Sequence, residues 1–134
     1  RLGQNAVISV PTLSQIAATA AITDADAISE LEAHIDRYRR NRDILLAGLD
    51  QRLLNNVEPP EGAFYIYLDT TRVSPDSVDL ADRLLNEAKV ATTPGADFDP
   101  VNGHKALRLS FAGSEDDMHE AVRRVNAWMA EHCH

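Results

Sequence analysis

Alternating hydrophobic and polar positions predict three extended segments in this chain. The stretch AFYIYLDTT, residues 63–71, alternates and is rich in aromatic residues, as is typical of a strand. The stretch KALRLSFAG, residues 105–113, alternates in the same way. KVATTPG, residues 89–95, is a shorter extended piece that a Pro-Gly turn ends.

Helical spacing of apolar residues predicts two helices in the first part of the chain. The stretch SVPTLSQIAATAAI, residues 9–22, is rich in alanine, and Pro11 suits the first turn of a helix. A long helix is predicted to follow, with Asp24 or Thr23 as its cap. Its apolar stripe consists of Ile28, Leu31, Ile35, Tyr38, Leu45, Leu49 and Leu53.

Two further helices are predicted around the extended segments. Residues 74–88 form a short helix with Ser74 or Asp76 as its cap. Its inward-facing residues are Leu80, Leu84 and Leu85. The final helix is predicted to begin at Ser114, where SEDD forms a capping box. Its buried stripe consists of Met118, Ala121, Val122, Val125 and Trp128. This order of elements predicts a small sheet covered by helices, an α/β two-layer arrangement.

Composition and charge limit the number of domains and the kinds of partner that the sequence allows. With 134 residues, 44% of them hydrophobic and 25% charged, the chain matches one globular domain, residues 1–134. The net charge of −8 and the presence of only two lysines, Lys89 and Lys105, argue against nucleic acid or an anionic membrane as a partner. No apolar run reaches the length of a membrane span, and a single Cys133 fits the reducing cytoplasm. The chain opens on RLGQN without an initiator methionine, which suggests a fragment of a longer protein.

The histidines and the cysteine predict neither a metal site nor a nucleophile with its base. His132, Cys133 and His134 form HCH at the C-terminus, but chain ends usually fray and no fourth ligand is evident. The remaining histidines are scattered over helices and a loop: His34, His104 and His119.

One arginine lies inside a predicted strand. The core face of residues 105–113 is formed by Leu107, Leu109 and Phe111. The opposite face places Arg108 among small residues: Ala106, Ser110 and Ala112. The forked donors of arginine suit bidentate binding of a carboxylate or phosphate. A structural ion pair with one of the 21 acidic residues is the alternative, and the pattern alone leaves both open.

Five blocks of this sequence, in order and at suitable spacing, resemble one family: SVPTLSQIAATAA, YRRNRDILLAGL, PPEGAFYIYLD, VATTPGADF and LRLSFAGSEDDM. Over residues 4–132 the chain is similar to the C-terminal small domain of class I/II aminotransferases, which are pyridoxal-phosphate enzymes of the aspartate aminotransferase fold. The resemblance implies a small, mostly antiparallel sheet covered on one side by helices.

The resemblance also implies roles for three residues. The arginine of the R-L-S-F strand, here Arg108, grips the α-carboxylate of the substrate in this family. The aromatic residue of the G-A-F-Y block, Phe64, lies near the substrate, although simple packing in the core stays an open alternative for it. Ser9, in S-V-P, resembles the residue that approaches the cofactor phosphate of the partner subunit in the family dimer.

Three features depart from the family pattern. The lysine that forms the Schiff base with pyridoxal phosphate lies upstream in the family, and neither Lys89 nor Lys105 replaces it by position. Arg1 lies too close to Pro11 to be the phosphate-binding arginine of the family, and is expected to belong to a preceding helix. The arginine that selects dicarboxylates is replaced by Asn5, so specificity for aspartate or glutamate is not expected.

These observations predict the substrate-binding domain of an aminotransferase that moves an amino group between an amino acid and a 2-oxo acid. The implied cofactor is pyridoxal 5'-phosphate, and the implied partners are the substrate, an N-terminal large domain of the same protein and a second subunit. By itself the chain is expected to be inactive. Two alternatives stay open: a ligand-sensing aminotransferase-like domain of a transcription regulator, and a non-catalytic interaction domain in which Arg108 is structural.

Overall fold

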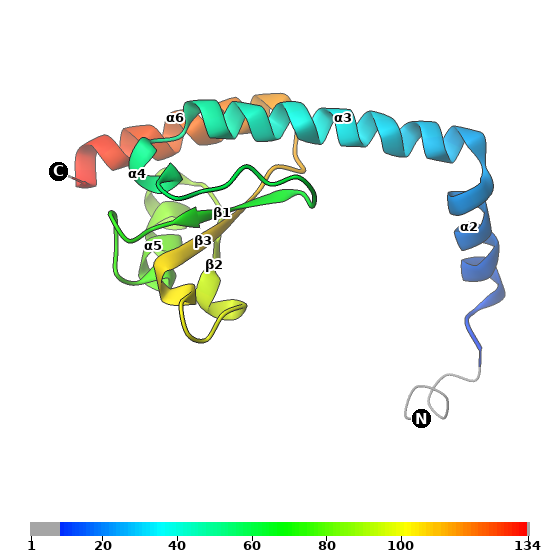
Figure 1. Ribbon diagram of the computed structural model, residues 1–134, viewed down its shortest axis with the longest axis horizontal. Helices are drawn as coiled ribbons and strands as arrows, with labels where there is room; N and C mark the ends of the chain where they lie inside the picture. The colour runs from blue at the N-terminus through cyan, green and yellow to red at the C-terminus, as the bar shows by residue number, and fades with distance from the viewer. Residues whose placement is uncertain (1–8, 134) are drawn as a thin grey trace. The chain divides into compact units, whose positions relative to one another are not determined.

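The computed structural model describes residues 9–133 of the chain. They belong to two compact units, residues 1–36 and residues 37–134, and helix α3 continues from one unit into the other (Figure 1). In chain order the elements are α2 (Thr12–Thr23), α3 (Ala25–Gly48), α4 (Gln51–Leu54), β1 (Tyr65–Asp69), α5 (Ser77–Arg83), η1 (Leu84–Ala88), β2 (Thr93–Pro94), η2 (Gly95–Asp97), η3 (Gly103–Lys105), β3 (Ala106–Ser110) and α6 (Glu115–His132).

The first unit contains α2 and the N-terminal part of α3. Asp24 separates these helices and caps α3, because its Oδ1 accepts the backbone N–H of Asp26 at 2.9 Å. No residue of α2 is buried. The apolar positions Ile28, Leu31 and Ile35 of α3 are likewise exposed in this unit. The predicted helices are therefore confirmed here, but their apolar faces are not covered within the unit.

The second unit is built on a three-stranded antiparallel sheet with the strand order β1-β3-β2. β3 is the central strand, and its Arg108 pairs with Tyr67 of β1 on one side and with Thr93 of β2 on the other. The alternating pattern of residues 105–113 is confirmed, since Leu107 and Leu109 are buried whereas Ser110 is exposed.

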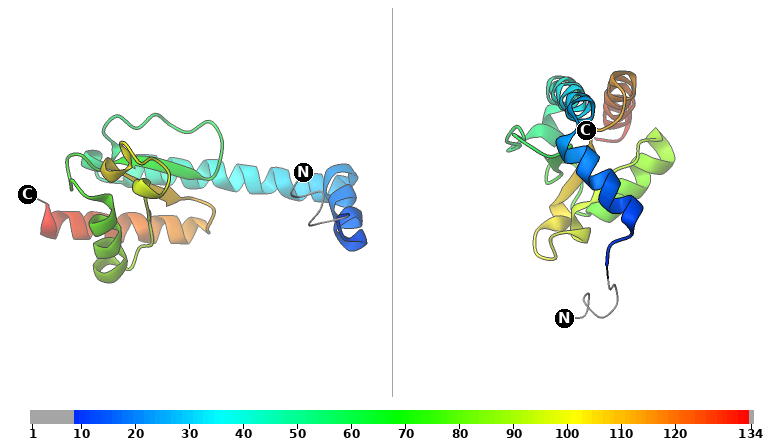
Figure 2. Two further views of the ribbon diagram at one scale, coloured as in Figure 1. Left: turned by 90° about the horizontal axis from the view of Figure 1, so that it is seen from below. Right: turned by 90° about the vertical axis from the view of Figure 1, so that its right-hand side faces the viewer.

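Helices cover one face of this sheet. The C-terminal part of α3 and α6 lie side by side there (Figures 1 and 2), and α4 and α5 complete the layer. The core between the layers contains Leu45, Leu49, Leu53, Ile66, Leu68, Leu80, Leu84, Leu107, Leu109, Phe111, Met118, Val125, Trp128 and Met129. This arrangement confirms the predicted α/β fold, a small antiparallel sheet covered on one side by helices.

The prediction of one long helix up to Leu53 is wrong in one respect. Helix α3 ends at Gly48, and a separate helix, α4, follows. Asp50 leaves the helical conformation, and its side chain accepts the backbone N–H of Arg52 to cap α4. Asn126 of α6 compensates the break: its amide donates to the Gly48 carbonyl at 2.7 Å and accepts the Asp50 N–H at 2.9 Å. A Cβ at Gly48 would lie 2.8 Å from a methyl of Val122, so glycine permits α6 to approach this closely.

The inward orientation predicted for Leu85 is also wrong. Leu80 and Leu84 are buried, but Leu85 is 49% exposed. Leu84 follows Leu80 by four residues and shares its helix face, whereas the next residue lies about 100° further round. Asp76 caps α5 by accepting two backbone N–H groups, and the capping box predicted at Ser114 is confirmed at the start of α6.

Candidate functional site

Arg108 lies half-buried on the sheet face opposite the helices. In the register of the sheet, Tyr65 and Tyr67 of β1 lie on this same face, opposite Ser110 and Arg108 respectively. The small neighbours predicted along β3 are present, with Ala106 buried and Ser110 exposed. The arginine is thus held by the central strand, and aromatic residues of the neighbouring strand flank it.

The guanidinium of Arg108 contacts two aromatic rings. Its Cζ lies over the ring of Tyr65, 5.2 Å from the centroid, and over the ring of Phe98, 4.5 Å from the centroid. Within residues 9–133, the side chain of Arg108 has no hydrogen bond and no ion pair. The structural ion pair considered from the sequence is therefore not found among the described residues. These ring contacts use none of the N–H donors in a hydrogen bond, so the five donors of the guanidinium are left for a ligand.

Phe98 belongs to a tightly closed segment between β2 and β3. Its backbone N–H donates to the Gly95 carbonyl at 2.9 Å. The side chain of Asp99 accepts the N–H groups of Val101 at 2.8 Å and Asn102 at 3.1 Å. The N–H of Asn102 is the largest cause that lowers the pKa of Asp99, so this carboxylate stays charged within its turn.

Two glycines bring this segment against itself and against the sheet. A Cβ at Gly103 would lie 2.2 Å from the Gly95 carbonyl oxygen, so side chains are excluded where the two turns meet. A Cβ at Gly95 would lie 2.5 Å from the hydroxyl oxygen of Tyr67. Burial raises the pKa of Tyr67, and the charge of Asp99 adds to the effect, so this phenol is neutral at physiological pH.

Phe64 contacts Tyr65, but its ring is not one of the two that lie against the guanidinium of Arg108. Its carbonyl accepts the backbone N–H of Phe111 at 2.8 Å, which extends the pairing of β1 and β3 by one step. Its ring is 49% exposed and meets the ring of Tyr65 edge-on, with centroids 5.7 Å apart. Packing in the core is therefore not what places Phe64, and a role near the substrate stays a prediction.

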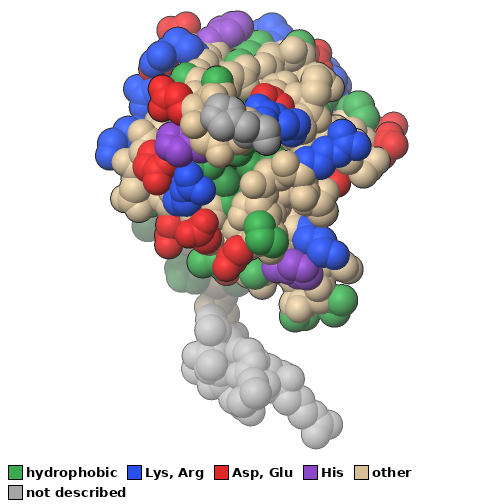
Figure 3. Space-filling model, turned by 90° about the vertical axis from the view of Figure 1, so that its left-hand side faces the viewer, with side chains coloured by type: hydrophobic (Ala, Val, Ile, Leu, Met, Phe, Trp, Pro, Cys, Tyr) green, Lys and Arg blue, Asp and Glu red, His purple; other side chains and the backbone are tan. Residues whose placement is uncertain are grey.

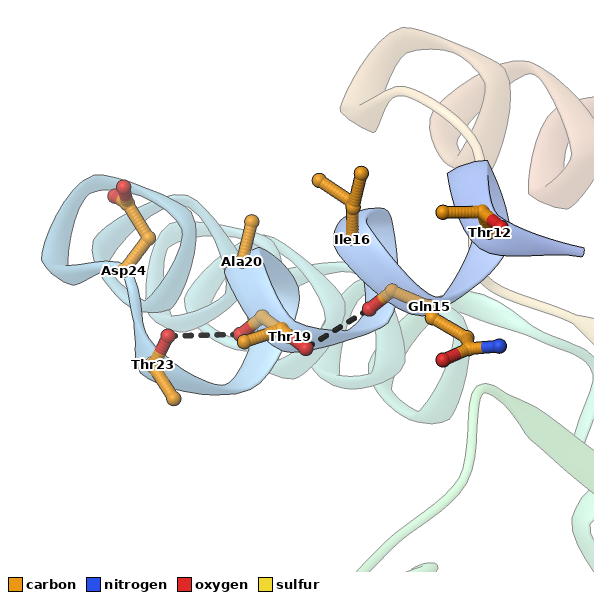
Figure 4. A pocket seen from close by; sticks show the side chains of 7 residues that line it. All are labelled: Thr12, Gln15, Ile16, Thr19, Ala20, Thr23 and Asp24. Atoms are coloured by element: carbon orange, nitrogen blue, oxygen red, sulfur yellow. Dashed lines mark hydrogen bonds between the residues drawn. The ribbon is translucent and has the colours of Figure 1, made fainter.

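Ser9 lies in the first unit, where it is exposed just before α2. A shallow hollow runs along α2 (Figure 4), lined by Thr12, Gln15, Ile16, Thr19, Ala20, Thr23 and Asp24. The hydroxyls of Thr19 and Thr23 each donate to a carbonyl one turn earlier at 2.8 Å, so the helix itself uses these donors. Ser9 does not line this hollow, and its predicted role stays untested. Asn5 and Arg1 lie outside the described residues.

Sequence reasoning found Arg108 but missed the residues that contact it. The alternation of residues 63–71 does place Tyr65 and Tyr67 on one face, yet the register that brings that face to Arg108 is set by strand pairing. Phe98 stands in a loop without periodicity. The only local signal is the DFDP stretch, in which Asp99 is a typical turn former.

Comparison with known proteins identifies the family. A family model described as aminotransferase class I and II matches residues 1–125. The chain belongs to this family. It is 40% identical over 125 residues to the valine–pyruvate aminotransferase of Mycobacterium tuberculosis, which covers 93% of this chain and 32% of that protein. It is 44% identical over 117 residues to the aspartate/prephenate aminotransferase of Thermus thermophilus, which covers 87% of this chain and 29% of that protein.

The fold of this chain agrees with solved structures of the family. The crystal structure of an aminotransferase from Mycobacterium tuberculosis matches it with a TM-score of 0.89 and 39% sequence identity, covering 97% of this chain and 33% of that one. The chain spans about a third of the length of the curated relatives it matches.

The family generally depends on pyridoxal phosphate, but the described residues do not fit the attachment of that cofactor. Lys89 lies on the surface and donates to the Asn86 carbonyl at 2.7 Å, and Lys105 is exposed at the end of η3. Among residues 9–133 there is also no cluster of histidine, cysteine and acidic side chains that would hold a metal ion. The uncommitted donors of Arg108 fit an anionic group such as a carboxylate or a phosphate.

Proposed function

We propose that this chain is the C-terminal substrate-binding domain of a pyridoxal-phosphate-dependent aminotransferase that transfers an amino group between an amino acid and a 2-oxo acid. The observation that carries the proposal is the guanidinium of Arg108, which two aromatic rings contact while its N–H donors stay uncommitted within the described residues. Membership of the aminotransferase family supplies the reaction class.

In this proposal Arg108 binds the α-carboxylate of the substrate through two charge-assisted hydrogen bonds. A bidentate contact fixes both the position and the plane of the carboxylate, so it orients the bonds at the neighbouring carbon. Tyr67, neutral and beside Arg108 in the sheet, is a further donor on the same face. Phe64 is expected at the edge of the substrate.

The cofactor acts as an electron sink when bound, and residues outside this chain would supply its attachment lysine. Ser9 would approach the cofactor phosphate of the partner subunit in a homodimer. An N-terminal large domain of the same protein would cover the Arg108 face of the sheet. Both relatives are named as aminotransferases, which favours catalysis over a sensor domain or an interaction domain.

We propose the cytoplasm as the location, with no nucleic-acid or membrane partner. None of the helices in the described part of the chain combines the length and the apolar character that crossing a bilayer requires. Figure 3 shows acidic and basic side chains interspersed over one face, in keeping with a net charge of −8 rather than with a basic binding surface.

For the substrates we propose an apolar amino donor such as valine and pyruvate as acceptor. The valine–pyruvate aminotransferase of Mycobacterium tuberculosis matches 93% of this chain, which supports this pair. The sequence also carries Asn5 where a dicarboxylate-selecting arginine would be expected. Aspartate is the competing donor, because the Thermus relative is named for it.

The full-length protein, loaded with pyridoxal phosphate, tests the proposal directly. Alanine formation from pyruvate is measured with each common amino acid as donor, and valine is expected to be used more efficiently than aspartate. Arg72→Lys serves as a matched control, since Arg72 is an exposed arginine in the turn after β1. A cofactor-loaded protein that transfers no amino group from any donor to pyruvate or other 2-oxo acids would overturn the proposal.

A further inference from the structure

We propose that Phe98 is a positioning residue for Arg108: its ring fixes the plane of the guanidinium so that the N–H edge faces the substrate carboxylate. The inference deepens the proposed function and rests on it. It assigns a role to a residue in the loop between β2 and β3, outside the strand that carries the arginine.

The contact itself has the geometry that orientation requires. The Cζ of Arg108 lies over the Phe98 ring at 4.5 Å, closer than its 5.2 Å from the ring of Tyr65. An arginine side chain has several freely rotating bonds, and holding it in one conformation normally costs entropy at the moment of binding. A ring in contact with the guanidinium restricts that freedom in advance and uses none of its donors in a hydrogen bond.

Packing in the hydrophobic core does not determine the position of Phe98. Its side chain is 54% exposed, and it is absent from the buried cluster between the sheet and the helices. Replacing it therefore removes little buried apolar surface. Its ring contact in the described structure is with the guanidinium of Arg108, which separates its role from that of the buried Phe111.

An orienting residue must itself be fixed, and the backbone of this segment provides that. The N–H of Phe98 is bonded to the Gly95 carbonyl, and the turn that follows is closed by three hydrogen bonds to Asp99. A Cβ at Gly95 or at Gly103 would clash with the backbone of the other glycine, so the two turns lie in direct contact. The backbone that carries the ring is thus held by local hydrogen bonds that do not involve Arg108.

The test uses the full-length, cofactor-loaded protein and compares two donors, L-valine and L-valinamide, which differ only in the carboxylate. For Phe98→Leu we expect kcat/KM for valine to fall about 5- to 30-fold, the factor that corresponds to the contact and the ordering it provides. The value for valinamide should stay almost unchanged, so that the discrimination between the two donors falls. Phe98→Tyr keeps the ring and should restore the discrimination.

Two controls make the result specific. Val101→Ala changes an exposed residue of the same segment, 72% exposed, and should leave both donors unaffected. In an Arg108→Ala background, Phe98→Leu should have no further effect on the valine reaction, because the residue it positions is gone.

The outcomes separate this inference from the proposed function. A wild-type protein that does not transfer amino groups, or treats valine and valinamide alike, contradicts the proposed function. A wild-type protein that discriminates strongly, together with a folded Phe98→Leu variant that discriminates equally well, overturns the inference alone. A Phe98→Leu variant whose kcat/KM falls equally for valine and valinamide, with a lowered melting temperature, would assign Phe98 a structural role. That result would also overturn the inference.

Discussion

The guanidinium of Arg108 lies over the ring of Phe98, with Cζ 4.5 Å from the ring centroid, although one residue lies on a central strand and the other in a loop. This contact explains how an arginine on a sheet face is held without an acidic partner among the described residues. A carboxylate partner would occupy the donors that a ligand needs, whereas an aromatic ring leaves them available.

The first prediction concerns Arg108→Lys in the full-length protein. Lysine keeps the positive charge but loses the fork, so the carboxylate of the substrate is left poorly paired and the reacting bond misoriented. We expect kcat/KM to fall by the equivalent of about 3–5 kcal/mol in transition-state stabilisation. Steady-state kinetics with the best amino donor gives this value.

The same variant separates substrate binding from a structural role. Small neighbours such as Ala106 tolerate the slimmer side chain, and the described structure gives Arg108 no ion pair to lose. The melting temperature and the cofactor content should therefore match the wild type. A destabilised variant that is fully active on amino acids would show that Arg108 does not anchor the carboxylate.

The second prediction is that residues 1–134, expressed alone, neither catalyse transamination nor bind pyridoxal phosphate. Lys89 is directed to a backbone carbonyl on the surface and Lys105 is exposed, so neither is placed to hold the cofactor. Absorbance spectra of the purified chain after incubation with the cofactor and gel filtration check this. A stoichiometric band of bound cofactor that sodium borohydride fixes to the chain would contradict the prediction.

The third prediction concerns Asn41, which is fully buried in α3. Its Nδ2 donates to the carbonyls of Phe111 at 2.8 Å and Gly113 at 2.9 Å, so it joins α3 to the turn between β3 and α6. Asn41→Ala leaves these two carbonyls without their donor and should lower the free energy of unfolding by about 2–4 kcal/mol. Urea unfolding of the chain measures the loss.

A control for Asn41 is available on the surface. The exposed Asn86 donates to the Asp82 carbonyl within one helix, at 2.8 Å. Asn86→Ala should change the unfolding free energy by no more than about 0.5 kcal/mol. Equal effects of the two substitutions would mean that the buried bonds of Asn41 contribute nothing particular.

Much of the second unit could be predicted from the sequence because its signals are local. Alternation identified β1 and β3, and the capping box fixed the start of α6 at Ser114. The break at Asp50 could not be predicted, because it depends on Asn126 of a distant helix supplying both hydrogen bonds that the break requires. An apolar stripe likewise continues through Ile28 to Leu45, although only the later part is buried within the chain.

In the candidate site too, some residues could be predicted from local sequence signals and others could not. Arg108 could be found from its strand and from its family motif, since both are read from neighbouring residues. The contact with Phe98 depends on how a closed turn folds back on the sheet, and such contacts between a loop and a strand leave no periodic signal. Neutral Tyr67 follows from burial beside Asp99, which only the folded structure provides.

The fourth prediction is that the isolated chain self-associates through α2. Large apolar side chains are strongly exposed there, with Leu13 at 81% and Ile22 at 75%. Apolar surface of this kind promotes association in water. Sedimentation velocity at increasing concentration should show oligomers, and the double substitution Leu13→Glu and Ile22→Glu should reduce them. A wild-type chain that stays monomeric at high concentration would contradict the prediction.

The last prediction is that the bond between the single tryptophan and Glu87 makes the stability of the fold depend on pH. The indole Nε1 of Trp128 donates to the carboxylate of Glu87, and this bond is the largest cause that lowers the pKa of Glu87; the positive charge of Arg83 and the proximity of His132 add to it. The folded state therefore favours the ionised carboxylate. Ionised Glu87 therefore stabilises the fold at pH values above 4.5, the ordinary pKa of this carboxylate. The stabilisation is lost as the pH falls through the lowered pKa of the folded state.

Glu87→Gln keeps an acceptor for the indole but removes the titration. Thermal unfolding followed by Trp128 fluorescence, from neutral pH to about pH 3, should show that the wild type loses more stability than Glu87→Gln. Other carboxylates contribute to the wild-type loss, among them Glu120, whose pKa its bonds to Arg123 and Arg124 lower to about 2. The difference between the two proteins isolates Glu87, and Glu58→Gln in the exposed loop before β1 controls for removal of a charge alone. Parallel pH profiles for the wild type and Glu87→Gln would show that the indole bond does not couple the fold to this carboxylate.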